Sequence, residues 1–261
     1  MGDHLNIEDK LRLADRLVAI AREAGALIMV HYQAGATATL KADASPVTAA
    51  DEAADALILE RLGAAAPQIP VISEEAFASG HKPAVGACFF LVDPLDGTKE
   101  FISHNGEFTV NIALIEDGRP VLGVVYAPAI GRMFFANGNG QAFERMGDGP
   151  DRPIHVARPQ ADGFRVVASR SHRDAQTEAY LATVKVAELK SAGSSLKFCL
   201  LAAGEADLYP RFGPTMEWDT AAGHAVLAAA GGSVSGIDGE AFLYGKAGSG
   251  FKNPSFIARG G

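Results

Sequence analysis

The chain has 261 residues, and 48% of them are hydrophobic, so it is long enough to form one large domain or two smaller ones around a sizeable core. Its 23 Lys and Arg against 31 Asp and Glu give a formal net charge of -8, which argues against a broad basic surface for polymeric nucleic acid. No apolar run approaches the roughly 20 residues of a membrane-spanning helix, and the first residues are polar, so we expect a cytoplasmic protein with no membrane span.

The first part of the chain carries two helical patterns. Apolar or small residues recur at alternating spacings of three and four, which predicts one long helix with a single buried stripe. After a polar linker at residues 41–46, the sequence TAAD at residues 48–51 has the pattern of a capping box and predicts a second helix from residue 49 to about residue 62. Asp51 would lie in its first turn, a structural role that needs no chemistry. The stripe of the first helix consists of Leu11, Ala14, Val18, Ala21, Gly25 and Ile28.

Strand patterns follow the two helices. Short apolar runs at residues 69–72 and 88–92 end abruptly in polar residues, which is typical of buried strands, and carboxylates follow each of them. Residues 108–115 and 120–126 flank a turn and predict a hairpin, and residues 133–135 predict a further strand of the same meander. The first part therefore reads as helices followed by a largely antiparallel sheet.

The second part of the chain alternates short strands with helices. Strands are predicted at residues 164–168 and 184–189, and helices at residues 194–203 and 220–230, which indicates a smaller α/β unit. The glycine-rich residues 236–250 predict mostly loop. We therefore expect an N-terminal α+β domain over residues 1–150 and a C-terminal α/β domain over residues 151–261.

The chain contains two cysteines, Cys88 and Cys199. Each has apolar neighbours, which fits buried reduced thiols better than a disulfide or a catalytic pair. A metal held by cysteine is therefore not expected.

The segment LVDPLDGT, residues 91–98, is the most informative part of the sequence. Pro94 fixes one φ angle and bends the chain, so Asp93 and Asp96 can converge while the carbonyl of Leu95 turns the same way. Three oxygen donors would then face one point. Gly97 permits close approach of a ligand, and its amide and that of Thr98 suit a phosphate oxygen if a helix starts there.

Two other acidic positions extend this pattern. Glu74 follows the strand predicted at residues 69–72, and Asp219 follows Trp218 at the start of a predicted helix. Taken singly, each motif is explained by an ordinary turn or a solvated strand end. Taken together, they favour a site for a hard divalent cation, because Mg²⁺ prefers carboxylate and carbonyl oxygens and commonly bridges them to phosphate. A cluster of cysteine and histidine, which would favour zinc, is absent from the sequence.

The sequences DPLDGT at residues 93–98 and WDTAAG at residues 218–223 resemble the two signatures of the inositol monophosphatase superfamily. SEE at residues 73–75 and KADASPVTAAD at residues 41–51 follow the expected order, so the resemblance spans nearly the whole chain. It departs at residues 227–232, LAAAGG, where many relatives have an acidic residue before the glycines. The resemblance implies an α+β / α/β layered sandwich, the sugar phosphatase fold, with the active site between a larger N-terminal and a smaller C-terminal part.

The same resemblance implies a ligand set for two or three Mg²⁺ ions. It also implies that Asp51 and Thr98, together with Glu74, position the water that attacks a phosphomonoester. The implied metal ligands are Glu74, Asp93, the Leu95 carbonyl, Asp96 and Asp219.

Within the superfamily, DGTKEF at residues 96–101 followed by NGEFTVNIAL at residues 105–114 resembles the 3'(2'),5'-bisphosphate nucleotidases associated with sulfate assimilation. SRSH at residues 169–172, GSSLK at residues 193–197 and LYPR at residues 208–211 resemble the same branch. The implied substrate is a small bisphosphorylated nucleotide such as 3'-phosphoadenosine 5'-phosphate, and the implied products are AMP and phosphate. A homodimer is also expected, since dimers are common among relatives. The implied substrate contacts are Gly97, Thr98, Lys99, His172, Ser194, Lys197, Arg211 and Asp219.

Other readings stay open at this point. A sibling phosphatase acting on inositol 1-phosphate or fructose 1,6-bisphosphate would use the same ligands. A non-catalytic nucleotide-binding module would show a broken ligand set, whereas every carboxylate position is present here. Without the resemblance, Lys197, Arg211 and His172 could equally be solvated surface residues.

Overall fold

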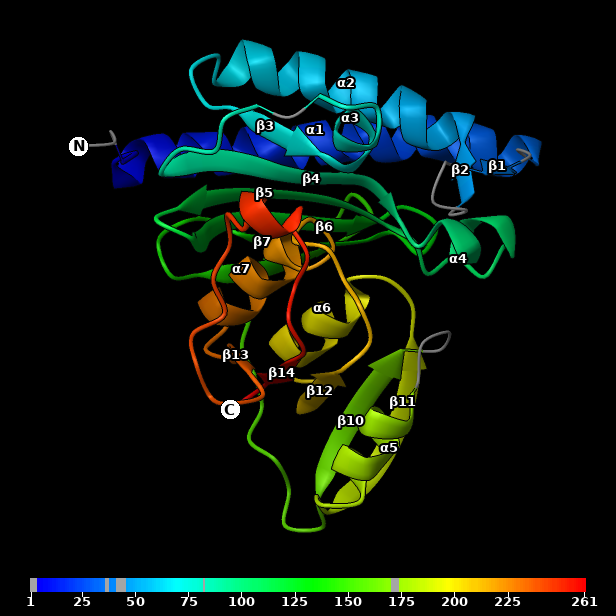
Figure 1. Cartoon of the computed structure of the whole chain (residues 1–261), viewed down its shortest axis with the longest axis vertical. Coiled ribbons are helices and arrows are strands. Elements are labelled where there is room, and N and C mark those ends of the chain that lie inside the picture. The colour runs from blue at the N-terminus through cyan, green and yellow to red at the C-terminus, as the bar shows by residue number, and fades with distance from the viewer. Residues whose placement is uncertain (1–3, 36–37, 41–45, 82, 170–173) are drawn as a thin grey trace.

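The computed structural model describes residues 4–35, 38–40, 46–81, 83–169 and 174–261. The chain forms stacked layers: a pair of helices, a seven-stranded sheet, a second pair of helices, a five-stranded sheet and an outer helix (Figure 1). The layered α+β arrangement expected from the sequence is confirmed. None of the helices within the described ranges combines the length and apolar character that a bilayer crossing requires.

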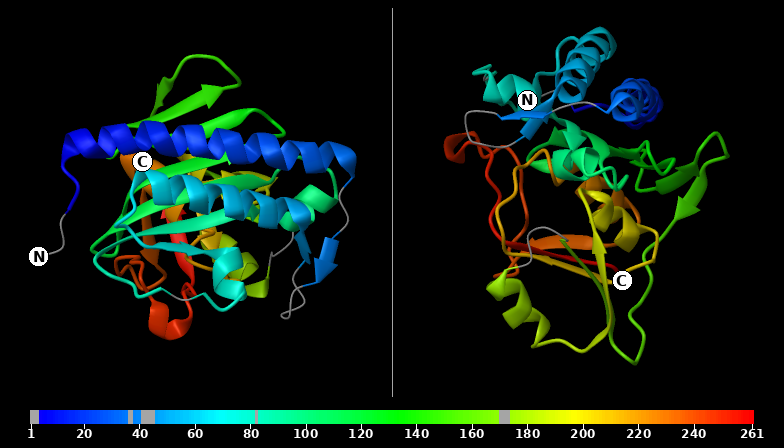
Figure 2. Two further views of the ribbon diagram at one scale, coloured as in Figure 1. Left: turned by 90° about the horizontal axis from the view of Figure 1, so that it is seen from above. Right: turned by 90° about the vertical axis from the view of Figure 1, so that its right-hand side faces the viewer.

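The outer helices α1 (Ile7–Ala34) and α2 (Ala49–Ala65) lie side by side over the seven-stranded sheet (Figure 2). Both were predicted, and the Thr48 cap of α2 has the expected capping box with Asp51. Leu11 is an error in the predicted stripe, because it is 37% exposed. The buried face of α1 is centred nearer Leu17 and Ala24, so Leu11 lies at its border.

The seven-stranded sheet has the order β3-β4-β5-β6-β7-β8-β9. β3 pairs with β4 in parallel, and every later pair is antiparallel, including the predicted β5/β6 hairpin. Short helices α3 (Glu74–Ala78) and α4 (Thr98–Ile102) follow β3 and β4. The strands are β3 (Val71–Ser73), β4 (Cys88–Asp96), β5 (Thr109–Glu116), β6 (Arg119–Ala127), β7 (Arg132–Ala136), β8 (Ala142–Met146) and β9 (Arg152–Ile154).

Some strands of this part were not predicted. β1 (Ala38–Leu40) and β2 (Pro46–Thr48) form a small antiparallel pair before α2. β8 and β9 continue the meander beyond the predicted strands. The division into domains after residue 150 remains a proposal, and β9 lies just beyond it while still pairing with β8.

The five-stranded sheet has the order β11-β10-β12-β14-β13. Helices α6 (Leu196–Ala202) and α7 (Ala221–Ala229) lie between the two sheets, and α5 (Ala175–Leu181) covers the outer face (Figure 1). The predicted strands and helices of this part are confirmed, whereas α5, β12, β13 and β14 were not predicted. The strands are β10 (Phe164–Ser169), β11 (Val186–Ala192), β12 (Leu208–Arg211), β13 (Ser233–Gly236) and β14 (Phe256–Arg259).

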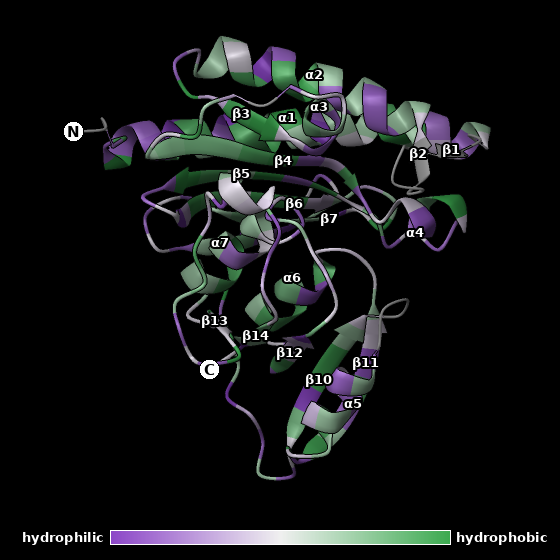
Figure 3. Cartoon of the chain, viewed as in Figure 1, coloured by the Kyte–Doolittle hydropathy of each residue, from purple (hydrophilic) through white to green (hydrophobic). Residues whose placement is uncertain are grey.

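The layers pack through alternating side chains. Along β5, Ile112 and Leu114 join the cluster under α1 and α2, whereas Ala113 and Ile115 join the cluster that contains α6 and α7. Successive residues of a strand point to opposite faces, so a strand covered on both sides is largely apolar. Figure 3 shows this hydrophobic character along β4 and β10. Both thiols are free as expected, with Cys199 buried and Cys88 partly buried.

Candidate active site

The acidic segment at the end of β4 is part of the strand. The sequence analysis placed the strand end at Val92, which is wrong, because β4 continues to Asp96. Asp93 pairs with Asn111 and Asp96 pairs with Thr109, so three steps along β4 face two steps along β5. β4 therefore has one residue more than β5 between these two pairs, which forms a β-bulge at Pro94 and Leu95. Residues three apart in a regular strand point to opposite faces, and the bulge removes that alternation so that both carboxylates can face one side.

Three carboxylates from distant parts of the chain meet beside this bulge. One oxygen each of Glu74, Asp93 and Asp219 lies within 4.8 Å of the other two. Glu74 is the first residue of α3, directly after β3, and the parallel pairing of β3 with β4 brings Glu74 and Asp93 to the same sheet edge. Asp219 enters from the loop before α7. An all-oxygen set of this kind fits a hard divalent cation.

The charges in this cluster repel one another. Burial raises the pKa of Asp93 well above its ordinary value, and the charges of Glu74 and Asp96 raise it further. The pKa of Asp219 is also raised well above its ordinary value, first by burial and then by Asp96 and Glu74. A bound divalent cation would offset both causes, because it supplies the opposite charge at the point where the carboxylates converge.

Asp96 lies next to the triplet and has partners of its own. Burial raises its pKa to about 6, while the ammonium of Lys197 and the backbone N–H of Ser195 oppose that rise. The Asn111 amide also donates to Asp96 Oδ2 at 3.4 Å. The predicted Leu95 carbonyl ligand stays a prediction; the Leu95 N–H donates to Asp93 Oδ1 at 3.0 Å.

Asp51 contacts both its helix and Thr98. Its Oδ2 accepts the Thr48 N–H at 2.8 Å and the Thr48 hydroxyl at 2.6 Å. Its Oδ1 accepts the Thr98 hydroxyl at 3.4 Å. The helix-capping role and the role toward Thr98 therefore use different oxygens of one buried carboxylate. The start of α4 at Thr98, with Gly97 in the left-handed region at φ 88°, agrees with the expected helix start.

A cavity of about 290 Å³ opens over these groups. Both acidic and basic residues line it. Asp51, Asp93 and Leu95 are buried beside it, and His172 lies outside the described residues. Of the predicted site residues, the cavity is lined by Glu74, Asp96, Gly97, Thr98, Lys99, Ser194, Lys197, Arg211 and Asp219.

The two basic residues of the cavity are held by backbone carbonyls. Lys197 is 4% exposed and donates to the carbonyl of Ala192 at 3.3 Å and to that of Ser194. Burial lowers its pKa to about 8, although Asp96 raises it. Arg211 is 8% exposed and donates to the carbonyls of Gly213 at 3.2 Å and Pro214 at 2.9 Å. Neither is a solvated surface residue, so that reading is wrong for both.

Some polar residues of the site were missed. Ser195 donates to Asn111 Oδ1 at 2.7 Å and lies 2.9 Å from the Thr109 hydroxyl, which links α6 to β5 and through Asn111 to Asp96. All three are buried. Their signal was present in the sequence, because Thr109 and Asn111 interrupt an otherwise apolar strand.

The wall of the cavity joins the two sheets. Glu107, in the loop before β5, accepts the Gly193 N–H at 2.8 Å through its carboxylate, and its backbone carbonyl accepts the Ser194 hydroxyl. Ser194 has a φ of 42°, in the left-handed region. These contacts fix the turn that precedes α6 against the loop that follows α4.

The chain is similar to known proteins over nearly its whole length. The model of the inositol monophosphatase family matches residues 9–259. The 3'(2'),5'-bisphosphate nucleotidase CysQ of Escherichia coli is 49% identical over 247 residues, which are 94% of this chain and 98% of that protein. The crystal structure of CysQ from Bacteroides thetaiotaomicron has a TM-score of 0.79 and 39% identity, covering 95% of this chain and 97% of that one. An IMPase of Thermotoga maritima has a TM-score of 0.77 and 25% identity, with coverage of 95% and 91%.

Proposed function

Because this chain belongs to the inositol monophosphatase family, we infer that it is a phosphomonoesterase, and we assign it as a 3'(2'),5'-bisphosphate nucleotidase. The identity to CysQ over most of both chains supports the substrate class. The observation that carries the assignment is the triplet of Glu74, Asp93 and Asp219 beside a cavity that also contains buried basic side chains. The reaction removes the 3'-phosphate of 3'-phosphoadenosine 5'-phosphate and yields AMP and phosphate.

We propose Mg²⁺ as the cofactor, with two or three ions held by the ligand set named from the sequence. Bound Mg²⁺ would lower the pKa of a coordinated water and offset the charge of the scissile phosphate. The chain itself orients the attacking water through Thr98, whose hydroxyl donates to Asp51 and can accept a hydrogen bond from water. A proton from the water can then pass to Thr98 Oγ1 as the Thr98 proton passes to Asp51 Oδ1.

Substrate choice needs contacts beyond the reacting phosphate. A second phosphate at the 5' position carries charge that a neighbouring ammonium or guanidinium can meet. Lys197 and Arg211 line the cavity and are held in place by backbone carbonyls. A guanidinium has five N–H donors, more than the two carbonyls beside Arg211 require. We propose that these two residues, with Lys99 and Ser194 at the cavity wall, bind the nucleotide.

A panel of substrates tests the assignment. Phosphate release is measured from 3'-phosphoadenosine 5'-phosphate, inositol 1-phosphate and fructose 1,6-bisphosphate, with Mg²⁺ and after chelation. We expect the highest kcat/KM for the nucleotide and no release without Mg²⁺. A higher kcat/KM for inositol 1-phosphate or fructose 1,6-bisphosphate would favour the sibling activity, and no release from any substrate would favour a non-catalytic binding module. A cytoplasmic location and a homodimer remain predictions.

A further inference from the structure

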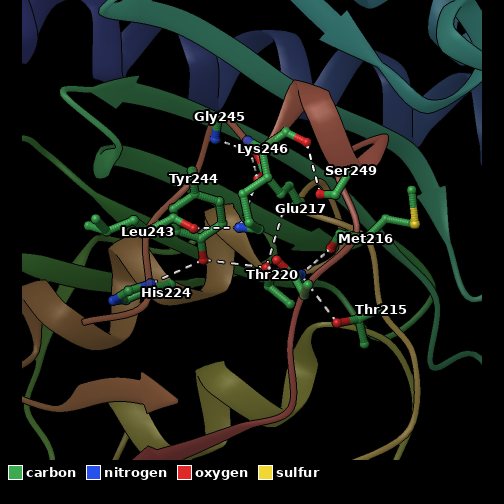
Figure 4. Close-up of polar contacts among 11 residues, drawn as sticks. Thr215, Met216, Glu217, Thr220, His224, Leu243, Tyr244, Gly245, Lys246 and Ser249 are labelled. Atoms are coloured by element: carbon green, nitrogen blue, oxygen red, sulfur yellow. Dashed lines mark hydrogen bonds and ion pairs between the residues drawn. The ribbon is translucent and has the colours of Figure 1, made fainter. Parts of the chain in front are cut away.

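The segment that carries Asp219, residues 215–220, is held by a loop from the end of the chain. This loop, residues 244–253, includes the short helical turn η1 (Ala247–Ser249) and precedes β14. We call it the bracing loop. Figure 4 shows its polar contacts with the Asp219 segment, and Glu217 lies at their centre.

Glu217 accepts two backbone hydrogen bonds and pairs with a cation. Its Oε2 accepts the N–H of Gly245 and its Oε1 accepts the N–H of Lys246, both at 2.8 Å. The Lys246 ammonium lies 2.8 Å from the same Oε1 (Figure 4). The Glu217 side chain has no exposed surface. A buried carboxylate is costly unless it is paired and hydrogen-bonded, so this arrangement specifies one position of the bracing loop.

The cation of this pair is itself fixed. The Lys246 ammonium lies 5.3 Å from the ring centroids of both Phe242 and Tyr244. It also donates to the Leu243 carbonyl at 2.5 Å. The Tyr244 hydroxyl in turn donates to Thr220 at 3.3 Å, one residue after Asp219. The contacts of Glu217 therefore continue to the other side of Asp219.

Asn253 provides the second attachment of the bracing loop. Its side-chain amide donates to the Met216 carbonyl at 2.7 Å and to the Thr220 hydroxyl at 3.1 Å. Its backbone N–H donates to the Thr215 carbonyl at 2.9 Å. The Met216 N–H donates to Asp219 Oδ2 at 2.8 Å, so the anchored segment directly orients the Asp219 carboxylate.

Aromatic contacts connect the same loop to the other side of the metal site. Phe251 of the bracing loop and Trp218 both pack on Phe77, each with ring centroids 5.5 Å from the Phe77 ring. Phe77 belongs to α3, whose first residue is Glu74. The bracing loop thus contacts the elements that carry Glu74 and Asp219, which lie far apart in the sequence.

We propose that Glu217 is a positioning residue, which through the bracing loop sets the position of Asp219 relative to Glu74 and Asp93 and thereby the affinity for Mg²⁺. The inference rests on the metal site proposed above. Divalent cations tolerate only small changes in ligand distance, and partners that orient ligands carry a large share of metal affinity. Glu217 does not line the cavity and makes no direct contact with a nucleotide there, whereas Asp219 does line it. Saturating Mg²⁺ should hold Asp219 in place, so the loss of Glu217 should appear as weaker metal affinity.

The variant Glu217→Gln tests this role. Glutamine keeps the shape but has one acceptor oxygen, so its NH₂ group opposes one of the two backbone N–H donors, and the charge that pairs with Lys246 is lost. We expect Mg²⁺ affinity to fall by roughly 10- to 100-fold. KM for the nucleotide at saturating Mg²⁺ should stay unchanged. Mg²⁺ binding is followed by the fluorescence of Trp218, the single tryptophan of the chain, and by the Mg²⁺ dependence of phosphate release.

A second variant and a matched control separate positioning from stability. Lys246→Met removes the cation and should also lower Mg²⁺ affinity. This variant tests the role even when Glu217→Gln does not fold. Asp207 is the control, because it too is a buried carboxylate that accepts a backbone N–H, from Arg165 at 2.8 Å, and pairs with that residue's guanidinium. Asp207 lies where β10 and β12 begin, whereas Ser169 and Arg211, which line the cavity, lie where these strands end. Asp207→Asn should lower the melting temperature and leave Mg²⁺ affinity unchanged.

The outcomes are distinct. Wild-type Mg²⁺ affinity in folded Glu217→Gln and Lys246→Met would overturn the positioning role. The same holds if both variants lose only thermal stability, as Asp207→Asn is expected to do. If the wild-type protein itself shows no response to Mg²⁺, the proposed metal site fails, which is a different result from failure of the Glu217 role alone.

Discussion

Asp51 shows how one side chain can serve both the fold and the site. Its Oδ2 caps α2 through Thr48, and its Oδ1 accepts the Thr98 hydroxyl. From the sequence, the capping role alone could account for the carboxylate. Because the two oxygens have different partners, the structural explanation does not compete with the catalytic one.

Asp51→Asn should separate the two roles. An asparagine oxygen can still accept the Thr48 N–H, but the amide nitrogen would donate toward Thr98 instead of accepting from it. We expect kcat to fall by about 10²- to 10⁴-fold with unchanged Mg²⁺ affinity, measured by steady-state phosphate release. Near-normal kcat would exclude Asp51 from orienting the water. As a control, Asn6→Ala removes the distant cap of α1 and should cost about 1 kcal/mol of stability without changing kcat.

Arg211→Ala should change substrate preference. If the guanidinium binds the 5'-phosphate, its loss raises KM for the bisphosphorylated nucleotide far more than KM for inositol 1-phosphate, which has no second phosphate to bind. Steady-state kinetics with both substrates measures the difference, and Lys185→Ala, on an exposed loop, is the charge-matched control. Equal increases for both substrates would contradict the role of Arg211.

At the scale of elements, the cavity wall depends on a close approach of two loops. A Cβ atom added at Gly193 would lie 2.7 Å from the Glu107 carbonyl oxygen and 2.8 Å from Glu100 Cγ. These distances are too short for a Cβ atom, so a side chain at position 193 would force the loop before β5 to move. Glycine at this position therefore allows the turn before α6 to reach its partner.

Gly193→Ala should displace this wall. Because Ser194 and Lys197 follow directly, we expect kcat/KM to fall by about 10- to 100-fold, measured on the nucleotide. Gly63 in α2 is the matched control, since nothing lies within 4 Å of an added Cβ there. Gly63→Ala should stabilise the helix by about 1 kcal/mol and leave kcat/KM unchanged. Unchanged activity in Gly193→Ala would show that the wall adapts.

Local patterns predicted most elements, whereas the features of the site that were missed depend on long-range contacts. The stripe of α1, the capping box of α2 and the β5/β6 hairpin are encoded by neighbouring residues. The bulge at Pro94 is not, because it is defined by the register against β5. The link from Asp96 through Asn111 to Ser195 joins residues that lie far apart in the sequence. The metal ligands were named through family motifs, whereas the contacts of Glu217 with the bracing loop had no recognisable motif.

At the scale of the molecule, the acidic cluster joins parts of the chain that belong to different layers. Asp93 belongs to the seven-stranded sheet, Glu74 directly follows its strand β3, and Asp219 precedes α7 between the sheets. Their mutual repulsion opposes the packing of these layers unless protons or cations offset it. Stability of the whole protein should therefore respond to both pH and Mg²⁺.

Without Mg²⁺, the acidic cluster should contribute more stability as pH falls from 8 toward 5. Groups whose pKa is raised on folding stabilise the folded state below their unfolded pKa, and this contribution is lost as pH rises through the folded value. The rise for Asp96, from 3.8 to about 6, contributes about 1 kcal/mol by pH 5. Burial of His224 lowers its pKa to about 4, so protonation of this residue in the unfolded chain opposes the effect of the cluster below pH 6.5. Melting temperatures in chelator across this pH range measure the effect.

Saturating Mg²⁺ should remove the contribution of the acidic cluster to the pH dependence of stability, because the cation offsets the repulsion between the carboxylates. Asp93→Asn should likewise flatten it and raise the melting temperature of the metal-free protein, at the expense of Mg²⁺ binding. Because His224 is present in both proteins, an Asp93→Asn variant with the same metal-free pH dependence of melting temperature as the wild type would contradict the repulsion inferred for the cluster.

β5 is buried along its whole length and carries Thr109 and Asn111. The amide protons of such a strand exchange with solvent only when the entire molecule opens, whereas the bracing loop has exposed residues at Ala247–Ser249 and opens through smaller fluctuations. Heating would thus release Asp219 before it disrupts Asn111. The protein would lose turnover while its circular dichroism still reports native secondary structure.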